Sequence, residues 1–217
     1  MSVPTTPACA RCASSATVAA TVSTPGTVRR DLDAKLSPLR SLFLNRALWL
    51  VLLTLFGIVT STLVAAQEEI LTSALVLAAF LAPIIDMGGN TGSQAATLVI
   101  RSMAVDTVRV AWRDVWAIVR RELMVAACLG ATVAALEVVL AYFVKSVSLD
   151  IMVIVGATML IVTVVGGLFG AVLPFAARAL RIDPATLSAP LITSIMDLVG
   201  VTIYFAIAAL VLSDQLV

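Results

Sequence analysis

Long apolar stretches, separated by short polar or charged segments, make up most of the sequence after about residue 45. About 20 mainly apolar residues in a helix are enough to cross the hydrocarbon core of a bilayer. Five stretches meet this length, and they lie near 46–66, 71–100, 123–144, 151–175 and 188–212. The pattern therefore predicts an all-α integral membrane protein with five transmembrane helices.

The segments outside these stretches have patterns of their own. Residues 29–45 place apolar side chains at helical spacing among charged ones, which predicts an amphipathic juxtamembrane helix. Residues 102–122 have the same character and carry tryptophans suited to headgroup depth, so we expect an interfacial helix there. Residues 1–28, rich in Ala, Ser and Thr, are expected to be a disordered tail, although a transit peptide fits the same composition. The transmembrane domain would then occupy 46–217.

Composition and charge support a membrane location. The chain is 61% hydrophobic and 12% charged and contains no histidine, which lies outside the range of soluble globular proteins. If the N-terminus is cytoplasmic, Lys145 is the one residue of 14 Lys and Arg that falls in an outer loop. The C-terminus is then outside, and we expect a bacterial inner membrane. Because the basic residues are sorted by loop and form no stripe, nucleic acid is not an expected partner.

The second apolar stretch contains the polar segment PIIDMGGNTGSQ, from Pro83 to Gln94. A charge such as Asp86 costs at least about 2.5–3.5 kcal/mol at the bilayer centre and normally faces a partner or a water-filled path. Asn90 lies four residues after Asp86 and shares its helix face. Pro83 and glycines such as Gly89 predict a kink or break whose freed carbonyls would line an ion path. The alternative is a kinked packing helix with interhelical hydrogen bonds.

The last apolar stretch contains one acidic residue, Asp197, about 15 Å along the helix from its inner end and therefore near the bilayer midplane. Thr193 and Gly200 share its helix face, and Ala189 continues this stripe one turn inward. Asp197 has no basic residue in any span to neutralise it. A cation site is therefore predicted, and the alternative is a protonated acid bonded to a neighbouring backbone.

The residues of both stretches resemble those of a known family. The segment from Pro83 to Gln94, with the TLVIR that follows it, resembles the second transmembrane helix of the MgtE magnesium channels and their animal solute-carrier relatives. APLITSIMDLVGVTIYF, from Ala189 to Phe205, resembles their last helix. The resemblance covers about residues 40–217 and implies that Asp197 is the magnesium-binding aspartate of the pore. The sequence departs from the family in two respects. It contains no counterpart of the large cytoplasmic magnesium-sensing region, and Ala189 stands where some members have a polar residue.

The residue types suit magnesium. Mg²⁺ prefers oxygen ligands and retains several waters, so one or two carboxylates suffice to hold it, and the lack of His argues against zinc or copper. Because one chain offers too little polar surface to line a pore, we expect a homodimer in which the second and fifth helices line a shared pore. Mn²⁺ and Co²⁺ are further candidate ions. The predicted metal site comprises Asp197, Asp86, Asn90, Thr193, Ala189, Gly89 and Gly200.

Other readings remain at this point. Broken helices with acidic residues also mark ion-coupled secondary transporters, so a Mg²⁺ exchanger is the alternative. An intramembrane aspartyl protease would need Asp86 and Asp197 as a dyad, but the residues around Asp86 lack the motif of those enzymes, and no enzymatic activity is expected. The GxxxG spacing of Gly166 and Gly170 predicts close packing against a neighbouring helix and a possible place for dimer contact. Glu137 either lines a path or reaches the outer interface.

Overall fold

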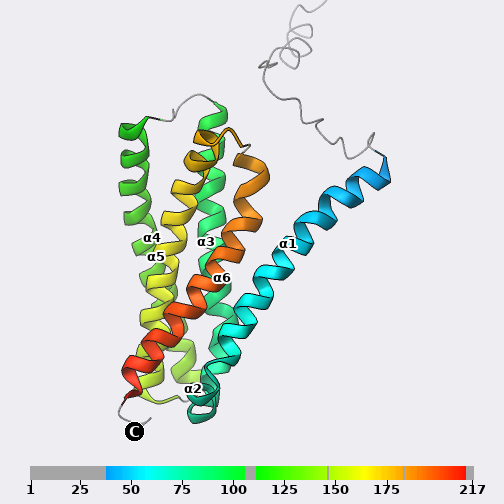
Figure 1. Ribbon diagram of the computed structural model, residues 1–217. Coiled ribbons are helices and arrows are strands. Elements are labelled where there is room, and N and C mark those ends of the chain that lie inside the picture. The colour runs from blue at the N-terminus through cyan, green and yellow to red at the C-terminus, as the bar shows by residue number, and fades with distance from the viewer. Residues whose placement is uncertain (1–37, 106–110, 146, 183, 214–217) are drawn as a thin grey trace, which may run out of the picture. The chain divides into compact units, whose positions relative to one another are not determined.

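A computed structural model describes residues 38–105, 111–145, 147–182 and 184–213. These residues are helical and contain no strand (Figure 1). The elements are α1 (Leu39–Ala65), α2 (Glu68–Ser73), the 3-10 helix η1 (Leu75–Leu77), α3 (Ala78–Ala104), α4 (Trp112–Leu140), the π-helix η2 (Ala141–Lys145), α5 (Leu149–Ala179) and α6 (Pro184–Val211). Five helical segments are long and apolar enough to cross a membrane. The predicted all-α class and the five spans are confirmed.

The chain divides into two units, Met1–Arg46 and Ala47–Val217. The tail predicted over 1–28 lies outside the described residues, as does most of the amphipathic helix predicted over 29–45. From Leu39 onward, the rest of that predicted helix is continuous with α1. Side chains along α1 are largely exposed, in keeping with a helix that faces lipid.

The helix predicted over 102–122 is not a separate element in its described part. Its first residues end α3, and residues 112–122 form the first turns of α4, with 106–110 outside the described ranges. The apolar side chains of Val115 and Ile118 pack against a small cluster formed by Val99, Met103 and Phe175. Of the predicted apolar face, Val115 packs against the bundle, whereas Trp112 and Trp116 are 80% and 60% exposed, so the placement of the tryptophans at headgroup depth stays a prediction.

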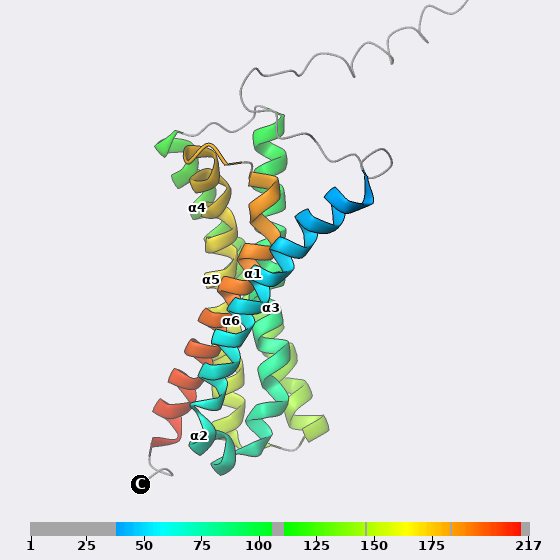
Figure 2. The same ribbon diagram turned by 45° about the vertical axis from the view of Figure 1, so that its right-hand side comes forward.

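Helix α5 is the centre of the second unit. It packs against α3, α4 and α6, and α3 also packs against α6 (Figures 1 and 2). The main core therefore forms where α5 meets α3 and α6, around Ile154, Met159 and Val162 of α5 and Tyr204 of α6. Burial of these apolar side chains against one another fixes which faces of the helices are turned inward.

Glycines allow α3 and α5 to touch through their backbones. A Cβ atom built on Gly166 or Gly170 would collide with the carbonyl oxygen of Gly88 or Gly92, respectively. The predicted close packing of Gly166 and Gly170 is thus confirmed, but their partner is α3 of the same chain. Buried here, they are not available as the dimer contact that the sequence suggested.

Of the kink or break predicted within the second span, the break is wrong. Helix α3 runs without interruption from Ala78 to Ala104 with Pro83 inside it. Close neighbours fill the space beside its glycines. A Cβ on Gly88 would lie 2.6 Å from Val162 Cγ1 of α5. The glycines therefore serve helix packing, and they free no carbonyl at membrane depth.

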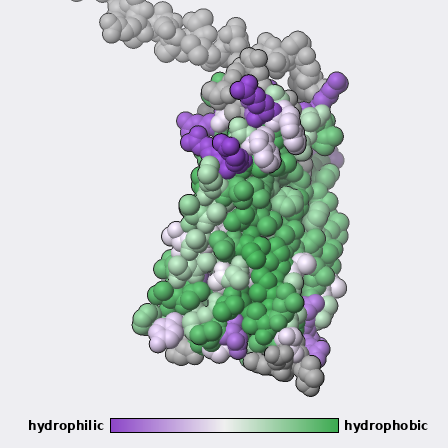
Figure 3. All heavy atoms as spheres, turned by 90° about the vertical axis from the view of Figure 1, so that its left-hand side faces the viewer, coloured by the Kyte–Doolittle hydropathy of each residue, from purple (hydrophilic) through white to green (hydrophobic). Residues whose placement is uncertain are grey.

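Apolar side chains cover the middle of the face shown in Figure 3, and polar side chains gather toward its ends. Exposed large residues of α4, including Leu129 and Leu136, contribute to the apolar part of the surface. Exposed arginines gather at one end of the bundle, where the parallel helices α3 and α5 end at Arg101 and Arg178. This distribution matches a helical bundle whose middle faces hydrocarbon.

Candidate ion site between helices α3 and α6

Helices α3 and α6 approach closely and run in opposite directions. A Cβ on Gly89 would lie 3.1 Å from Thr193 Cγ2, and one on Gly200 would lie 3.7 Å from Ile85 Cα. Later residues of α3 thus face earlier residues of α6, which makes the pair antiparallel. Gly89 and Gly200, both predicted site residues, are buried at these contacts. Neither has a side chain, so their contribution is to let the two backbones come together.

This packing brings the two predicted acids to similar heights. Asp86 lies between Ile85 and Gly89 on α3, while Asp197 lies between Thr193 and Gly200 on α6. The two contacts therefore bracket both acids. Asp86 is exposed and Asp197 is half-buried, so the pair opens toward the outside of the described bundle.

Asn90 orients the Asp86 carboxylate. Its side-chain Nδ2 donates a hydrogen bond of 2.8 Å to Asp86 Oδ2, which agrees with their spacing of four residues on one helix face. The bond uses the nitrogen of the amide and leaves Asn90 Oδ1 as an acceptor that points to no partner among the described residues. Both side chains are exposed. Together they present carboxylate and amide oxygens, which are ligands that hard divalent cations prefer.

Thr193 and Ala189 complete the predicted set. The Thr193 hydroxyl donates to the Pro190 carbonyl oxygen at 2.9 Å, so its hydrogen is used within α6 and its oxygen remains an acceptor. The methyl group of Thr193 faces Gly89. Ala189 belongs to α6, but its side chain lies outside the described residues. The structure therefore brings Asp86, Asn90, Thr193 and Asp197 to one interface.

The donor set is suited to an ion that keeps part of its water shell. Within the described residues, no group of three or more His, Cys, Asp or Glu side chains could enclose a metal ion. Two carboxylates and an amide oxygen are too few to replace all ligands of a cation such as Mg²⁺, which takes six and dehydrates reluctantly. The arrangement can instead hold a hydrated ion through a few direct or water-mediated contacts.

A further acid, Glu122, was missed by the sequence analysis. The predicted third span began at residue 123, whereas α4 begins at Trp112 and includes Glu122 well inside the helix. Glu122 is half-buried, and its Oε1 lies 3.4 Å from the point where a Cβ on Gly167 of α5 would be. The small residues Ala126 and Gly130, four and eight positions later, are the signal that this helix face packs against a neighbour. No described contact joins Glu122 or Glu137 to the α3–α6 interface.

Comparison with known proteins gives the family of this chain. Residues 81–207 match the model of the MgtE family, described as divalent cation transporters. A magnesium transporter MgtE of Thermus thermophilus is 36% identical over 173 residues, which are 79% of this chain and 37% of that protein. The MgtE proteins of Bacillus subtilis and Enterococcus faecalis are 28% and 30% identical over 76% of this chain and 36% of their own lengths.

The chain thus spans little more than a third of the length of these relatives. The matched segment begins in α3 and ends in α6, so it contains both helices of the candidate site. The family and the five apolar helices together support a multi-pass integral membrane protein. With the family model matching more than half of its residues, the chain belongs to the MgtE family of divalent cation transporters.

Proposed function

We propose that this protein conducts Mg²⁺ across the membrane along the surface where α3 and α6 meet, within a homodimer. The observation that carries the proposal is that Asp86 and Asp197 lie at similar heights on two packed helices that would cross the bilayer. Two acidic side chains at similar heights on packed helices are costly at such a depth without a cation. A divalent cation offsets this cost, and membership of a divalent cation transporter family supports that reading.

The chemistry of the site favours Mg²⁺ passing with waters attached. Asp86, Asn90 and Asp197 supply oxygen ligands and no nitrogen or sulfur ligand, which is the preference of hard cations. A few contacts to a hydrated ion bind weakly enough for it to leave again, as conduction requires. Mn²⁺ and Co²⁺ remain competitors, since both accept oxygen ligands in similar geometry.

A second copy of the chain would complete the path. Asp86 and Asn90 are exposed in the single chain, and an exposed charged surface at hydrocarbon depth must be covered by protein or water. Two copies related by a two-fold axis would place two α3–α6 surfaces face to face and bring both Asp197 carboxylates toward the axis. We place this dimer in a bacterial inner membrane with its N-terminus inside.

The continuous α3 removes the main argument for a coupled exchanger, and it also removes the freed carbonyls that the sequence suggested for the path. The exchanger alternative drew on a broken helix at the midplane, and α3 has no break. A protease would require the two acids to share a proton and act on a peptide, and no observed feature favours that. Channel conduction is therefore the function we assign to the α3–α6 surface.

Mg²⁺ uptake into liposomes by the purified protein tests the proposal. We expect Asp197→Asn to retain fold and dimerisation but to bind Mg²⁺ about ten- to a hundredfold more weakly, the range expected when a charged partner is lost. Glu137→Gln is the matched control, because it neutralises a half-buried acid of α4 that has no contact with the site. Equal loss of flux in both variants, or normal uptake by Asp197→Asn, would refute the assignment.

A further inference from the structure

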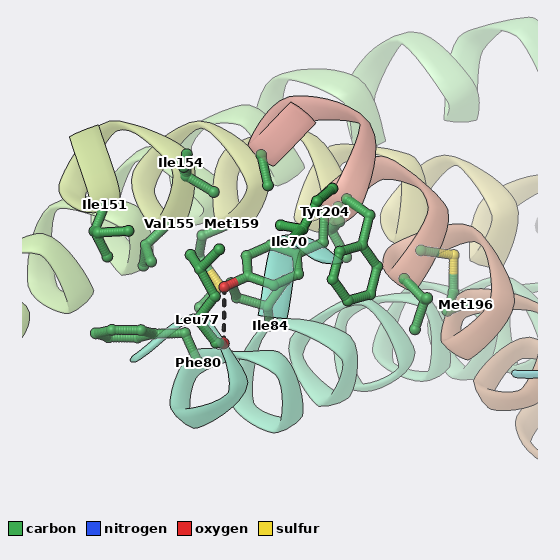
Figure 4. Close-up of a cluster of buried hydrophobic side chains, with 14 of the residues drawn as sticks. Ile70, Leu77, Phe80, Ile84, Ile151, Ile154, Val155, Met159, Met196 and Tyr204 are labelled. Atoms are coloured by element: carbon green, nitrogen blue, oxygen red, sulfur yellow. Dashed lines mark hydrogen bonds between the residues drawn. The ribbon is translucent and has the colours of Figure 1, made fainter. Parts of the chain in front are cut away.

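Tyr204 links the outer part of α6 to the beginning of α3. Its hydroxyl donates a hydrogen bond of 2.9 Å to the backbone carbonyl of Leu77, and the whole side chain is buried. Figure 4 shows the ring among the side chains of the main core, with the hydroxyl directed at the Leu77 carbonyl. The hydroxyls of Thr193 and Thr202 on the same helix bond within α6. Tyr204 therefore makes a polar contact of a different kind, between two helices.

Leu77 marks the point where α3 begins. It is the last residue of η1 and the N-terminal cap position of α3, and no side chain caps this helix. The bond from Tyr204 of α6 thus anchors the first turn of α3 to α6. Because hydrogen bonds require defined distance and direction, this contact specifies the position of α3 along α6.

The same bond fixes the heights of the two acids. Asp86 follows Leu77 by nine residues, or about 13.5 Å of helix, and Asp197 precedes Tyr204 by seven, or about 10.5 Å. In an antiparallel pair both distances run in the same direction from the bond. Helices α3 and α6 are uninterrupted over these lengths, so they transmit the position of the bond to the acids.

The remaining contacts between α3 and α6 set the separation of the helices more than their relative height. They consist of glycines and apolar side chains, such as Gly88 against Met196 and Gly92 against Ile192. Apolar burial is not directional, so these contacts hold the relative height through side-chain fit alone, and the Tyr204 bond adds a directional contact to them. A shift of about one residue, near 1.5 Å, is comparable with an Mg–O distance of about 2.1 Å and would break a direct contact between a carboxylate and the ion.

We propose that Tyr204 is a positioning residue for the ion site: its bond to the Leu77 carbonyl holds Asp86 and Asp197 at a fixed offset in height, about 3 Å by these lengths, and so favours Mg²⁺ over the larger Ca²⁺. Mg²⁺ demands near-octahedral geometry, whereas Ca²⁺ accepts longer and more variable contacts, so loss of the bond affects Mg²⁺ more. This inference rests on the proposed function, because it assumes that the two acids bind the transported ion.

The test compares Mg²⁺ and Ca²⁺ binding by the full-length protein, using titration calorimetry on wild type, Tyr204→Phe, Thr202→Val and Asp197→Asn. Tyr204→Phe keeps the ring and removes the hydroxyl. We expect its Mg²⁺ affinity to fall about two- to tenfold, with a smaller change for Ca²⁺. Thr202→Val removes a hydroxyl that bonds within α6 and should leave both affinities unchanged.

The outcomes separate the two proposals. A lower thermal midpoint for Tyr204→Phe with an unchanged ratio of Mg²⁺ to Ca²⁺ affinity would mean that the bond is structural only and would overturn the inference. Unchanged Mg²⁺ binding by Asp197→Asn would instead overturn the proposed function. If Tyr204→Phe does not fold, 3-fluorotyrosine at position 204 keeps the ring and the bond but makes the hydroxyl a stronger donor, so the ratio of Mg²⁺ to Ca²⁺ affinity should rise, and an unchanged ratio would overturn the inference.

Discussion

The backbone contact between α3 and α5 makes a graded prediction about glycine substitution. In Gly170→Ala, the added methyl group would collide with the carbonyl oxygen of Gly92, and neither backbone can move without displacing its helix. Overpacking of this kind costs about 1–3 kcal/mol or more. Alanine gains up to about 1 kcal/mol over glycine in a helix, which is not enough to offset the collision. We therefore expect Gly170→Ala to be clearly destabilised.

Two further glycines serve as matched controls for this substitution. A Cβ on Gly57 of α1 meets nothing within 4 Å, so Gly57→Ala should be neutral or slightly stabilising. A Cβ on Gly200 meets its nearest neighbour at 3.7 Å, an ordinary contact, so Gly200→Ala should fall between the other two. The order of stability should be Gly57→Ala, then Gly200→Ala, then Gly170→Ala.

Thermal unfolding in detergent, followed by loss of helical circular dichroism or by aggregation, would measure this order. Mg²⁺ uptake by the same variants would show whether displacement of α3 reaches the ion site, and we expect flux to fall with Gly170→Ala. The reasoning fails if Gly170→Ala unfolds at the same temperature as Gly57→Ala, since the two helices would then not be in backbone contact.

Three other predictions follow from particular residues. Asn90→Ala removes the donor that orients Asp86, so Mg²⁺ affinity in a titration should drop about two- to tenfold; an unchanged affinity would exclude this orienting role. Glu122→Gln removes a half-buried charge with no described ion pair or hydrogen bond, so its thermal midpoint should equal or exceed that of wild type, and a lower one would indicate a partner for the carboxylate. Removal of residues 1–25 should leave liposome uptake intact because their composition cannot form a core, and loss of flux by a folded, truncated protein would contradict this.

The five spans were predictable because the thickness of the hydrocarbon core sets the length of an apolar helix whatever its neighbours are. Their ends were less predictable. The boundary placed before residue 123 followed the charges of Arg120, Arg121 and Glu122, whereas the helix continues through them from Trp112. Arginines can keep their charge near the headgroups with a long side chain, so charge alone did not mark the helix end.

The interior of α3 shows why a local sequence pattern can predict a helix break that does not occur. Proline and glycine weaken a helix in isolation, and the sequence therefore predicted a break between Pro83 and Gly92. In the fold, Gly88 and Gly92 lie against α5 and Gly89 lies against α6, so packing compensates for their low helix propensity. Which glycines break a helix and which accept a neighbour depends on contacts far along the chain.

The candidate site was also predictable from the sequence only in part. The residue types of Asp86, Asn90 and Asp197, and the shared face of the first two, followed from the sequence because they depend on spacing within one helix. The similar height of Asp86 and Asp197 did not, because it depends on how α3 and α6 are positioned along each other. That position is set by contacts between residues more than a hundred positions apart, such as Tyr204 with Leu77.

The glycines of α3 also restrict how a path along this helix could open and close. Contact with α5 on one side and α6 on another leaves α3 unable to rotate about its own axis without driving backbone atoms together. Opening by a turn of α3 that swings Asp86 in or out would have to break these contacts. If the backbone contacts with α5 persist, α3 and α5 move as a single body, and a gate would form by displacement of this body against a second copy of the chain or against α6.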